Sequence, residues 1–424
     1  MLDTDAETQT RVEAKSAPFS ASEEVLTAAL KDLIREGALV VKFASGRERR
    51  FGQASAEAVR VWLRDGSAAR RLMANAELTL GELYADGLLS VDGDDVDGLL
   101  ALILQNLRKR DFRARAAPAG MRLFEAPRRE INNRRRAERN VAHHYDISNE
   151  LYRLFLDEDL QYSCAYFETG AESLEEAQEA KKELIAAKLC LRPGLSVLDI
   201  GCGWGGLALH LAQTRNVNVR GITLSQAQLP VARVRAAARG LAGQTEFALE
   251  DYRETKGVFD RIVSVGMFEH VGRGHYDEFF AQMAALMAED GVALLHTIGR
   301  ADGPGATSPW INRYIFPGGY TPALSEIMPA IERAGLHVTD IEVWRLHYAY
   351  TLAAWRKRFE ARIDDVRAMF DERFCRMWRF YLAASEAAFR HGGHAVFQIQ
   401  LARRQDAVPR TRRYLERRSN APRA

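Results

Sequence analysis

Alternating apolar and polar positions near the start of the chain predict a small domain of mixed structure. Apolar residues occupy every second position over residues 39–43, and a Ser-Gly pair follows, so we expect a β-hairpin there. Residues 78–107 carry apolar side chains at helical spacing at both ends, with a Gly/Asp-rich break between them. We therefore predict a small α+β domain over residues 21–106, preceded by a disordered polar stretch at residues 1–20.

The pattern then changes to a basic segment that contains helix-breaking residues. Residues 107–140 hold twelve basic and four acidic residues together with Pro118, Gly120 and Pro127, which predicts a linker. Residues 403–423 hold eight arginines and two acidic residues. Because the net charge of the whole chain is only +2, these two concentrated patches indicate an anionic surface as partner, either a membrane or a nucleic acid.

Residues 141–424 show the pattern of a larger domain of alternating helices and strands. Ser173 followed by Glu176 is a capping box that opens an amphipathic helix, which we expect to end at Pro193-Gly194. Directly after it comes an apolar run that leads into a glycine-rich turn.

The turn lies within VLDIGCGWGGLALHLA at residues 197–212, in the order strand, glycine turn, helix. Glycines let the backbone bend sharply and approach a ligand, which the following helix N-terminus faces. Further strands are predicted within residues 217–225 and 259–272. The spacing predicts a doubly wound α/β sheet with its ligand at the C-terminal ends of the strands.

Two differences from the usual dinucleotide-binding sequence indicate the type of cofactor. A nicotinamide-binding protein usually has an acidic residue at the end of the second strand, where this chain has Thr223, Leu224 and Ser225. The glycine spacing is GxGxG, whereas the dinucleotide fingerprint is GxGxxG. Both departures favour S-adenosylmethionine (SAM), which has no pyrophosphate.

The cysteines and the N-terminal residues indicate the cellular environment of the protein. The four cysteines form no CxxC pair and no zinc-like spacing, so we expect no disulfide framework and a reducing, cytoplasmic environment. The N-terminus lacks the apolar core of a signal peptide, and no apolar run approaches the ~20 residues of a membrane span. We expect a protein that is soluble or associates peripherally with the inner face of the membrane.

Eight motifs carry a specific family resemblance between residues 140 and 410. In order they are HYDISNELYRLFLD, YSCAYF, VLDIGCGWGG, GITLSQAQ, DRIVSVGMFEHVG, HTIG, YIFPGGYTP and HYAYTLAAW. Together they closely resemble the cyclopropane-fatty-acyl-phospholipid synthase family of SAM-dependent methyltransferases. The resemblance implies a class I SAM-methyltransferase fold, with a mostly parallel Rossmann-like sheet. The first 106 residues look like the smaller N-terminal domain of its phospholipid-using branch.

The resemblance also implies a site, residue by residue. Contacts to SAM are implied for Tyr162, Ser163, Asp199, Gly201, Gly203, Thr223, Gln228, Asp251 and Tyr252. A bicarbonate ion is implied at Cys164, Val265 (through its backbone), Glu269, His296 and Tyr348, and the four side chains among them are the expected catalytic residues. A local departure from the family pattern is Ala227, where an acid is common. We expect no metal, because no second ligand stands at metal spacing from Glu269-His270.

The expected chemistry explains these residue types. The π bond of an alkene attacks the sulfonium methyl and leaves a carbocation, which aromatic faces stabilise by about 0.5–2 kcal/mol each. Candidates for this role are Tyr145, Phe167, Phe268, Tyr314 and Phe316. A base in a dry cavity then removes a proton from the new methyl group so that the ring closes. His296 and Tyr348 can donate to bicarbonate, and Glu269 can accept from its hydroxyl. Cys164 has no activating neighbour in the sequence, so we do not expect a nucleophile.

Three alternatives remain open from the sequence. The same methyl transfer can give a methyl-branched or methylene chain, and small-molecule N-methyltransferases share much of the site pattern. A non-catalytic lipid- or nucleic-acid-binding protein is disfavoured by the full set of site residues. We expect a phospholipid bilayer as partner through the basic segments, and no nucleic acid, because those segments lack interleaved aromatic residues. A homodimer is expected from the resemblance.

Overall fold

The computed structural model describes residues 20–115 and 148–416. Contacts group the chain into two compact units, Met1–Asn106 and Leu107–Ala424. The predicted disordered stretch 1–20, apart from its last residue, lies outside the described residues, as do His143, His144 and Tyr145.

The N-terminal unit contains a four-stranded sheet with strand order β2-β1-β3-β4. Strands β1 (Ala38–Lys42) and β2 (Glu48–Gly52) pair antiparallel, which confirms the predicted hairpin. Strand β3 (Ala58–Leu63) runs parallel to β1, and β4 (Leu89–Val91) pairs antiparallel with β3. The helices of this unit are α1 (Ala21–Leu33), α2 (Ala68–Ala74), α3 (Ala76–Ala85), the 3-10 turn η1 (Asp92–Asp94) and the first part of α4 (Val96–Arg115), which continues past Asn106.

Helix α4 differs from the predicted linker. The linker was expected from residue 107, but the helix continues through Arg115. The physical reason is that arginine and lysine are good helix formers and that no proline or glycine interrupts the chain before Pro118. The rest of the predicted linker, residues 116–140, lies outside the described residues.

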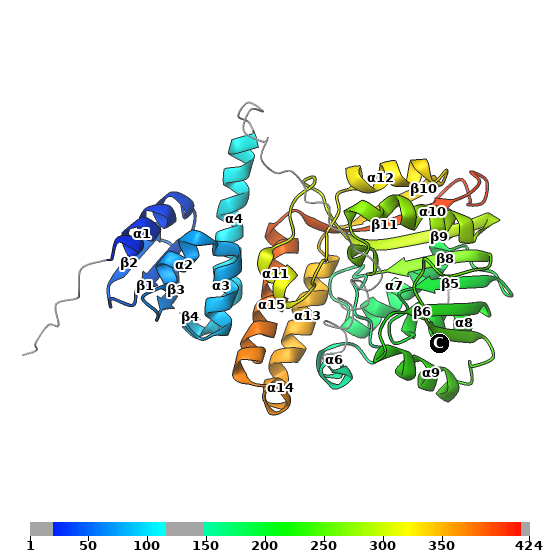
Figure 1. Ribbon diagram of the computed structural model, residues 1–424, viewed down its shortest axis with the longest axis horizontal. Helices are drawn as coiled ribbons and strands as arrows, with labels where there is room; N and C mark the ends of the chain where they lie inside the picture. Colours follow the sequence, from blue (N-terminus) through cyan, green and yellow to red (C-terminus); the bar gives the residue numbers. More distant parts are fainter. Residues whose placement is uncertain (1–19, 116–147, 417–424) are drawn as a thin grey trace, which may run out of the picture. The chain divides into compact units, whose positions relative to one another are not determined.

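The C-terminal unit is built on a seven-stranded sheet with order β10-β11-β9-β8-β5-β6-β7 (Figure 1). Strands β5 to β9 run parallel to one another, and β11 runs antiparallel to both of its neighbours, β9 and β10. This confirms the doubly wound, mostly parallel sheet. The strands are β5 (Ser196–Ile200), β6 (Asn218–Thr223), β7 (Thr245–Leu249), β8 (Phe259–Val265), β9 (Met287–Arg300), β10 (His337–Trp344) and β11 (His394–Ala402).

Helices cover both faces of this sheet, and α13 and α15 pack side by side (Figure 1). They are α6 (Asn149–Phe155), α7 (Leu174–Lys188), α8 (Gly206–Arg215), α9 (Gln228–Ala238), α10 (Tyr276–Leu286), α11 (Pro309–Tyr314), α12 (Leu324–Arg333), α13 (His347–Ala361), α14 (Ile363–Met369), α15 (Glu372–His391) and α16 (Arg413–Glu416), with 3-10 turns η3 (Phe268–His270) and η4 (Arg273–His275). The capping box of Ser173 and Glu176 opens α7 as predicted. The helix ends at Lys188 rather than at Pro193, and Cys190 just beyond it has a left-handed φ of 50°.

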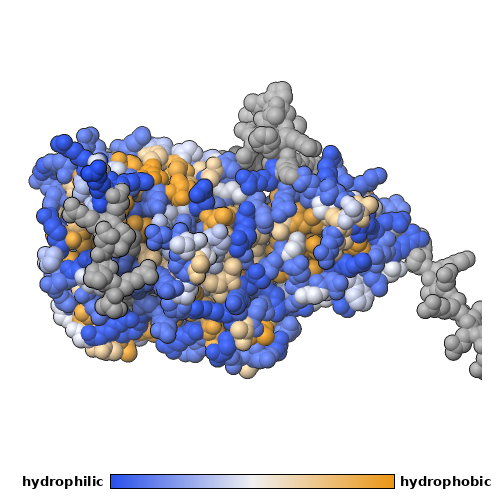
Figure 2. Space-filling model, turned by 180° about the vertical axis from the view of Figure 1, so that it is seen from behind, coloured by the Kyte–Doolittle hydropathy of each residue, from blue (hydrophilic) through white to orange (hydrophobic). Residues whose placement is uncertain are grey.

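Two apolar clusters hold the sheet between its helices. One packs β8, β9 and β11 against α10 and α12, through residues such as Phe280 and Ile327. The other packs β5 and β6 against α7, α8 and α9, through residues such as Ile185 and Leu211. The face drawn in Figure 2 is mostly hydrophilic, with hydrophobic colour in separate patches. Within the described ranges, no helix combines the length and apolar character that crossing a bilayer requires.

Candidate active site

A cavity opens at the C-terminal ends of β5, β6 and β8, where a doubly wound sheet is expected to bind its ligand. All nine residues for which the sequence predicted SAM contacts line it: Tyr162, Ser163, Asp199, Gly201, Gly203, Thr223, Gln228, Asp251 and Tyr252. Val265 lines the same cavity. Residues far apart in the sequence are thus brought to one pocket.

The glycine turn between β5 and α8 requires glycine for two different reasons. Gly201 has a φ of 84°, and a Cβ there would stand 2.8 Å from the Cβ of Met267. Gly203 has a φ of 56°, but a Cβ there would meet only Nε2 of Gln228, at 4.0 Å. Gly201 therefore allows close packing, whereas Gly203 keeps the cavity wall low enough for a ligand to approach the backbone.

Asp199, at the end of β5, gives the cavity a buried carboxyl group. Its side chain is 2% exposed, and its Oδ2 has no hydrogen-bond partner among the described residues. Burial raises the pKa of Asp199 to about 7, although the nearby Lys181 opposes the shift. A buried carboxyl oxygen without a donor is costly, so this group fits a ligand that brings hydrogen-bond donors, as the ammonium and ribose hydroxyls of SAM do.

Helix α7 holds the segment that carries Tyr162 and Ser163, and the sequence reasoning missed this role. Gln178 Nε2 donates to the carbonyls of Gln161 and Ser163, at 3.1 and 3.0 Å. Lys181 Nζ donates to Gln161 Oε1 and Ser163 Oγ, at 2.7 and 2.8 Å. Lys181 lies four residues after the buried Ala177 and three before Leu184, and Gln178 lies seven residues before the buried Ile185. Polar residues on the apolar face of α7 were therefore the available signal.

The buried Lys181 also fixes the direction of the Ser163 hydroxyl. Lys181 is fully buried, and burial lowers its pKa to about 8. An ammonium group can only donate, so Ser163 Oγ accepts from Lys181 and keeps its own hydrogen free. Because Ser163 lines the cavity, that hydrogen is available to an acceptor on the ligand.

Glu269 follows β8 in the turn η3, and its side chain contacts strand β9. Its Oε1 accepts from the backbone N–H of Ile298 at 2.5 Å. Its Oε2 is buried, and no described residue offers it a hydrogen bond. Burial raises the pKa of Glu269 to about 7. One carboxylate oxygen is thus anchored while the other remains available to a donor.

His296 lies on β9 opposite Val265 of β8, and its tautomer follows from its neighbours. Gln398 Oε1 accepts from the ammonium of Lys188 at 2.7 Å, so its Nε2 is the end that faces His296. That Nε2 donates to His296 Nδ1 at 3.1 Å. Burial, reinforced by Lys181 and Lys188, holds the pKa of His296 well below its usual range. The ring is therefore neutral, with the proton on Nε2, and can act as a donor.

The HYAYTL motif at the start of α13 anchors the YSCAYF segment. Thr351 Oγ1 accepts from the backbone N–H of Ala165 at 3.0 Å, and His347 Nδ1 accepts from that of Phe167, also at 3.0 Å. Cys164, directly before Ala165, is fully buried, and burial raises the pKa of its thiol. A protonated thiol is a poor nucleophile, which agrees with the role that the sequence analysis gave it.

Tyr348 and the aromatic residues that were candidates to stabilise a cation pack in different places. Tyr348 packs between Trp355 and Phe389, at ring distances of 5.8 and 4.9 Å. Phe316 lies 5.9 Å from the cavity residue His270. Phe268, which was a candidate to stabilise a cation, stacks instead on Tyr276 at 4.5 Å within the core.

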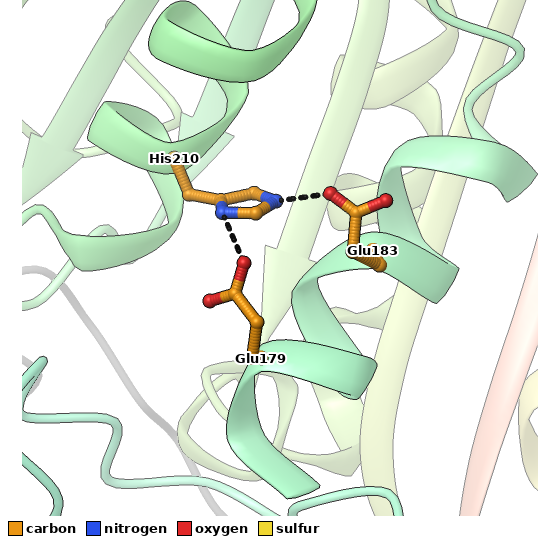
Figure 3. Close-up of side chains that lie close together, drawn as sticks. All are labelled: Glu179, Glu183 and His210. Atoms are coloured by element: carbon orange, nitrogen blue, oxygen red, sulfur yellow. Dashed lines mark hydrogen bonds and ion pairs between the residues drawn. The ribbon is translucent and has the colours of Figure 1, made fainter. Parts of the chain in front are cut away.

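The described residues contain one group spaced for a metal ion, formed by Glu179, Glu183 and His210 (Figure 3). Its imidazole faces a different carboxylate with each ring nitrogen, at 3.2 Å for Glu179 and 3.0 Å for Glu183. Burial lowers the pKa of His210, but the two carboxylates raise it more. Lys182 and Arg215 also pair with these carboxylates. These ion pairs link α7 to α8.

The sheet order, the glycine turn and the cavity at the strand ends define a class I SAM-dependent methyltransferase. The model of the family described as mycolic acid cyclopropane synthetase matches residues 132–399. The chain belongs to the cyclopropane-fatty-acyl-phospholipid synthase family.

Three relatives illustrate this membership. Cyclopropane-fatty-acyl-phospholipid synthase of Escherichia coli K12 is 40% identical over 336 residues, 79% of this chain and 85% of that protein. Tuberculostearic acid methyltransferase UfaA1 of Mycobacterium tuberculosis is 40% identical over 285 residues, covering 64% of this chain and 66% of its own. The crystal structure of mycolic acid cyclopropane synthase CmaA1 complexed with SAH and CTAB is 34% identical, with a TM-score of 0.60, over 64% of this chain and 99% of that one.

Proposed function

We propose that this enzyme transfers the methyl carbon of SAM to the double bond of unsaturated acyl chains in membrane phospholipids and closes a cyclopropane ring. The observation that carries the proposal is the 40% identity to a phospholipid-using synthase over most of both chains. The match covers 79% of this chain, whereas the C-terminal unit, Leu107–Ala424, makes up only about three quarters of it. The likeness therefore extends into the N-terminal unit.

In this proposal the cavity holds SAM through the nine residues that line it. The sulfonium methyl of SAM supplies the carbon that the alkene takes up. Gly203 lets the ligand approach the backbone, and Ser163 offers the hydroxyl hydrogen that Lys181 leaves free. Asp199 accepts from donors on the ligand, which removes the cost of its buried, unpaired oxygen.

We also propose a bicarbonate site between Cys164, Val265, Glu269, His296 and Tyr348. The fit rests on two complementary groups: Glu269 Oε2 is buried without a donor, and His296 carries a proton on its Nε2. Bicarbonate held there would supply the base that takes a proton from the newly added methyl group. The role of Glu269 is to orient the site by accepting a hydroxyl hydrogen. The burial of Cys164, His296 and Tyr348, and of Glu269 Oε2, keeps water away from a developing cation.

The basic segments 107–140 and 403–423 support peripheral binding to anionic lipid on the cytoplasmic face of the membrane. Each Lys or Arg near such a surface is worth about 1 kcal/mol. Binding to vesicles that contain anionic lipid should therefore weaken steeply with salt. Salt-insensitive binding would rule out electrostatic docking. A homodimer remains part of the proposal, to be checked by light scattering.

A direct test compares acceptors. Incubate the protein with methyl-labelled SAM and vesicles of unsaturated phospholipid, vesicles of the saturated counterpart, or a small alkaloid-type amine. The proposal expects label in the unsaturated lipid alone. Label in the amine would favour a small-molecule N-methyltransferase, and no transfer to lipid would reject the proposal.

A second candidate is a methyl-branched or methylene product from the same first step. The 40% identity to tuberculostearic acid methyltransferase UfaA1 favours keeping it. Both outcomes begin with the same cation, so the residues of the cavity cannot separate them. Ring protons in the NMR spectrum of the product distinguish a cyclopropane from either alternative.

A further inference from the structure

One face of the N-terminal sheet is basic, and the proposed chemistry gives it no role. Cross-strand partners share a face of a sheet, as do residues two apart on one strand. By this rule one face of β2-β1-β3 presents Lys42, Glu48, Arg50, Arg60 and Trp62, with the buried Val40 between the two arginines. The same unit buries its apolar residues, such as Leu39 and Val41, so the exposed cations belong to an outward surface.

Trp62 is the aromatic centre of this face and remains 39% exposed. Arg64 Cζ lies 4.0 Å from the centroid of its ring, and Lys42 Nζ lies 4.9 Å from it. Cation–π contacts of this kind are worth about 0.5–1 kcal/mol at exposed sites. Two cations, Lys42 and Arg64, therefore lie over the indole ring.

The charge of the face is strongly one-sided. By this register Lys42, Arg50 and Arg60 share the face with Trp62 and with the carboxylate of Glu48, and Arg64 lies over the Trp62 ring. Glu48 lies 3.6 Å from Arg60, and both side chains are 55% exposed. An exposed pair of this kind is weak, so it leaves the surface positive and the arginine available to an anionic partner.

We propose that this face docks on the anionic headgroups of a lipid bilayer, with Trp62 seated at headgroup level. Tryptophan favours the boundary between water and hydrocarbon, because its ring is amphipathic. A single-stranded nucleic acid would need the faces of the indole for base stacking, and Arg64 and Lys42 already lie over that ring. The assignment rests on the proposed function, in that a membrane substrate requires the enzyme to reach a bilayer.

The test uses the full-length protein and vesicles of phosphatidylglycerol mixed with phosphatidylcholine, or of phosphatidylcholine alone. The triple substitution Lys42→Glu, Arg60→Glu and Arg64→Glu should weaken sedimentation with the anionic vesicles at least about tenfold. Trp62→Ala should weaken it severalfold. The matched control is Lys31→Glu, Arg35→Glu and Arg70→Glu, which changes the same charge at exposed positions on or next to α1 and α2 and should have a clearly smaller effect.

Each outcome decides the point. Equal losses in the test and control triples would show that only net charge matters, and would overturn the assigned face. Unchanged vesicle binding with a change in mass by light scattering would show that the face joins two copies of the chain, which also overturns it. The milder set Lys42→Gln, Arg60→Gln and Arg64→Gln keeps the test valid if the reversed charges prevent folding, and should give an intermediate loss.

The two levels of the account can fail separately. With unsaturated phospholipid dispersed in neutral detergent, docking is not needed, so the triple variant should keep the methyl-transfer rate of the unaltered protein. If the unaltered protein transfers no methyl to either form of lipid, the proposed function fails while the vesicle-binding result still stands. If it transfers methyl normally and the triple variant is as fast on anionic vesicles, the docking face is rejected.

Discussion

The two sides of the cavity differ in how their buried polar groups are satisfied. On the side of α7, Gln178 and Lys181 make four hydrogen bonds to Gln161 and Ser163. Asp199, which lines the cavity at the end of β5, keeps a buried oxygen that no described residue reaches. Glu269, in the turn after β8 and outside the cavity lining, does the same. The four bonds of the first side form without a ligand, although Gln178 Oε1 is also buried without a described partner. On the second side the buried oxygens belong to carboxyl groups, which are costly until a ligand supplies donors. Substitutions should therefore act on positioning in the first case and on chemistry in the second.

The largest effect is expected at Glu269. Glu269→Gln keeps the anchor to Ile298 but replaces an acceptor-only carboxylate, so turnover should fall by about 10²–10⁴. Binding of S-adenosylhomocysteine, measured by calorimetry, should change little. Equal losses of binding and turnover would place Glu269 in the architecture of the pocket, and unchanged turnover would remove it from the mechanism.

The same substitution should change the dependence of stability on pH. The pKa of Glu269 is raised from 4.5 to about 7, so the folded state binds the proton more tightly and stability falls as pH rises from about 4.5 through 7. Above that window Glu269→Gln should be more stable than the unaltered protein, by up to roughly 3 kcal/mol in urea unfolding, and the difference should shrink near pH 4.5. The exposed Glu332→Gln is the control. A gain in stability that is the same at pH 4.5 and above pH 7 would contradict the raised pKa of Glu269.

On the satisfied side, Lys181→Met should act through Ser163. Loss of two buried hydrogen bonds should weaken binding of S-adenosylhomocysteine by roughly 10- to 100-fold. Binding of 5′-methylthioadenosine, which lacks the amino-acid end, should weaken less. Lys182→Met is the matched control, because Lys182 pairs with Asp159 and Glu179 instead of Ser163. If both ligands weaken equally, Lys181 supports the fold rather than the serine hydroxyl.

The smallest effect is expected at Cys164. Its thiol is buried and protonated, and its Sγ contacts the carbonyl of Ala165 at 3.3 Å, a bond that a hydroxyl can also make. Cys164→Ser should therefore retain activity within about tenfold. Near-total loss together with a methyl- or acyl-cysteine adduct in the mass spectrum of the unaltered protein would restore a nucleophilic role.

The sequence predicted the residues that line the cavity better than the residues that hold them in place. Gly201, Gly203 and Thr223 stand at strand ends, where spacing alone places them at one edge of a parallel sheet. Lys181 was missed because a lysine pair in a helix ordinarily indicates a solvated face, and only its register against Ala177 and Leu184 marks it as buried. Strand β3 was missed because its polar positions include Arg60, which faces outward in a short strand.

Hydrogen bonds between residues far apart in the sequence could not be predicted from the pattern of apolar and polar positions. The tautomer of His296 depends on Gln398, and the orientation of Gln398 depends in turn on Lys188. These three residues come from β9, β11 and α7, so no local spacing connects them. Residues 107–115 of the predicted linker continue helix α4, because basic residues extend a helix as readily as they form a solvated chain.

The most direct test of the central claim follows the methyl hydrogens. Incubate the enzyme with SAM that carries a trideuterated methyl group and with vesicles of unsaturated phospholipid, then analyse the released fatty esters by mass spectrometry and NMR. The account predicts a ring carbon with two deuterons, upfield ring signals and loss of the double bond, because one deuteron leaves with the base. A methyl branch with all three deuterons, or a lipid without deuterium, would contradict it.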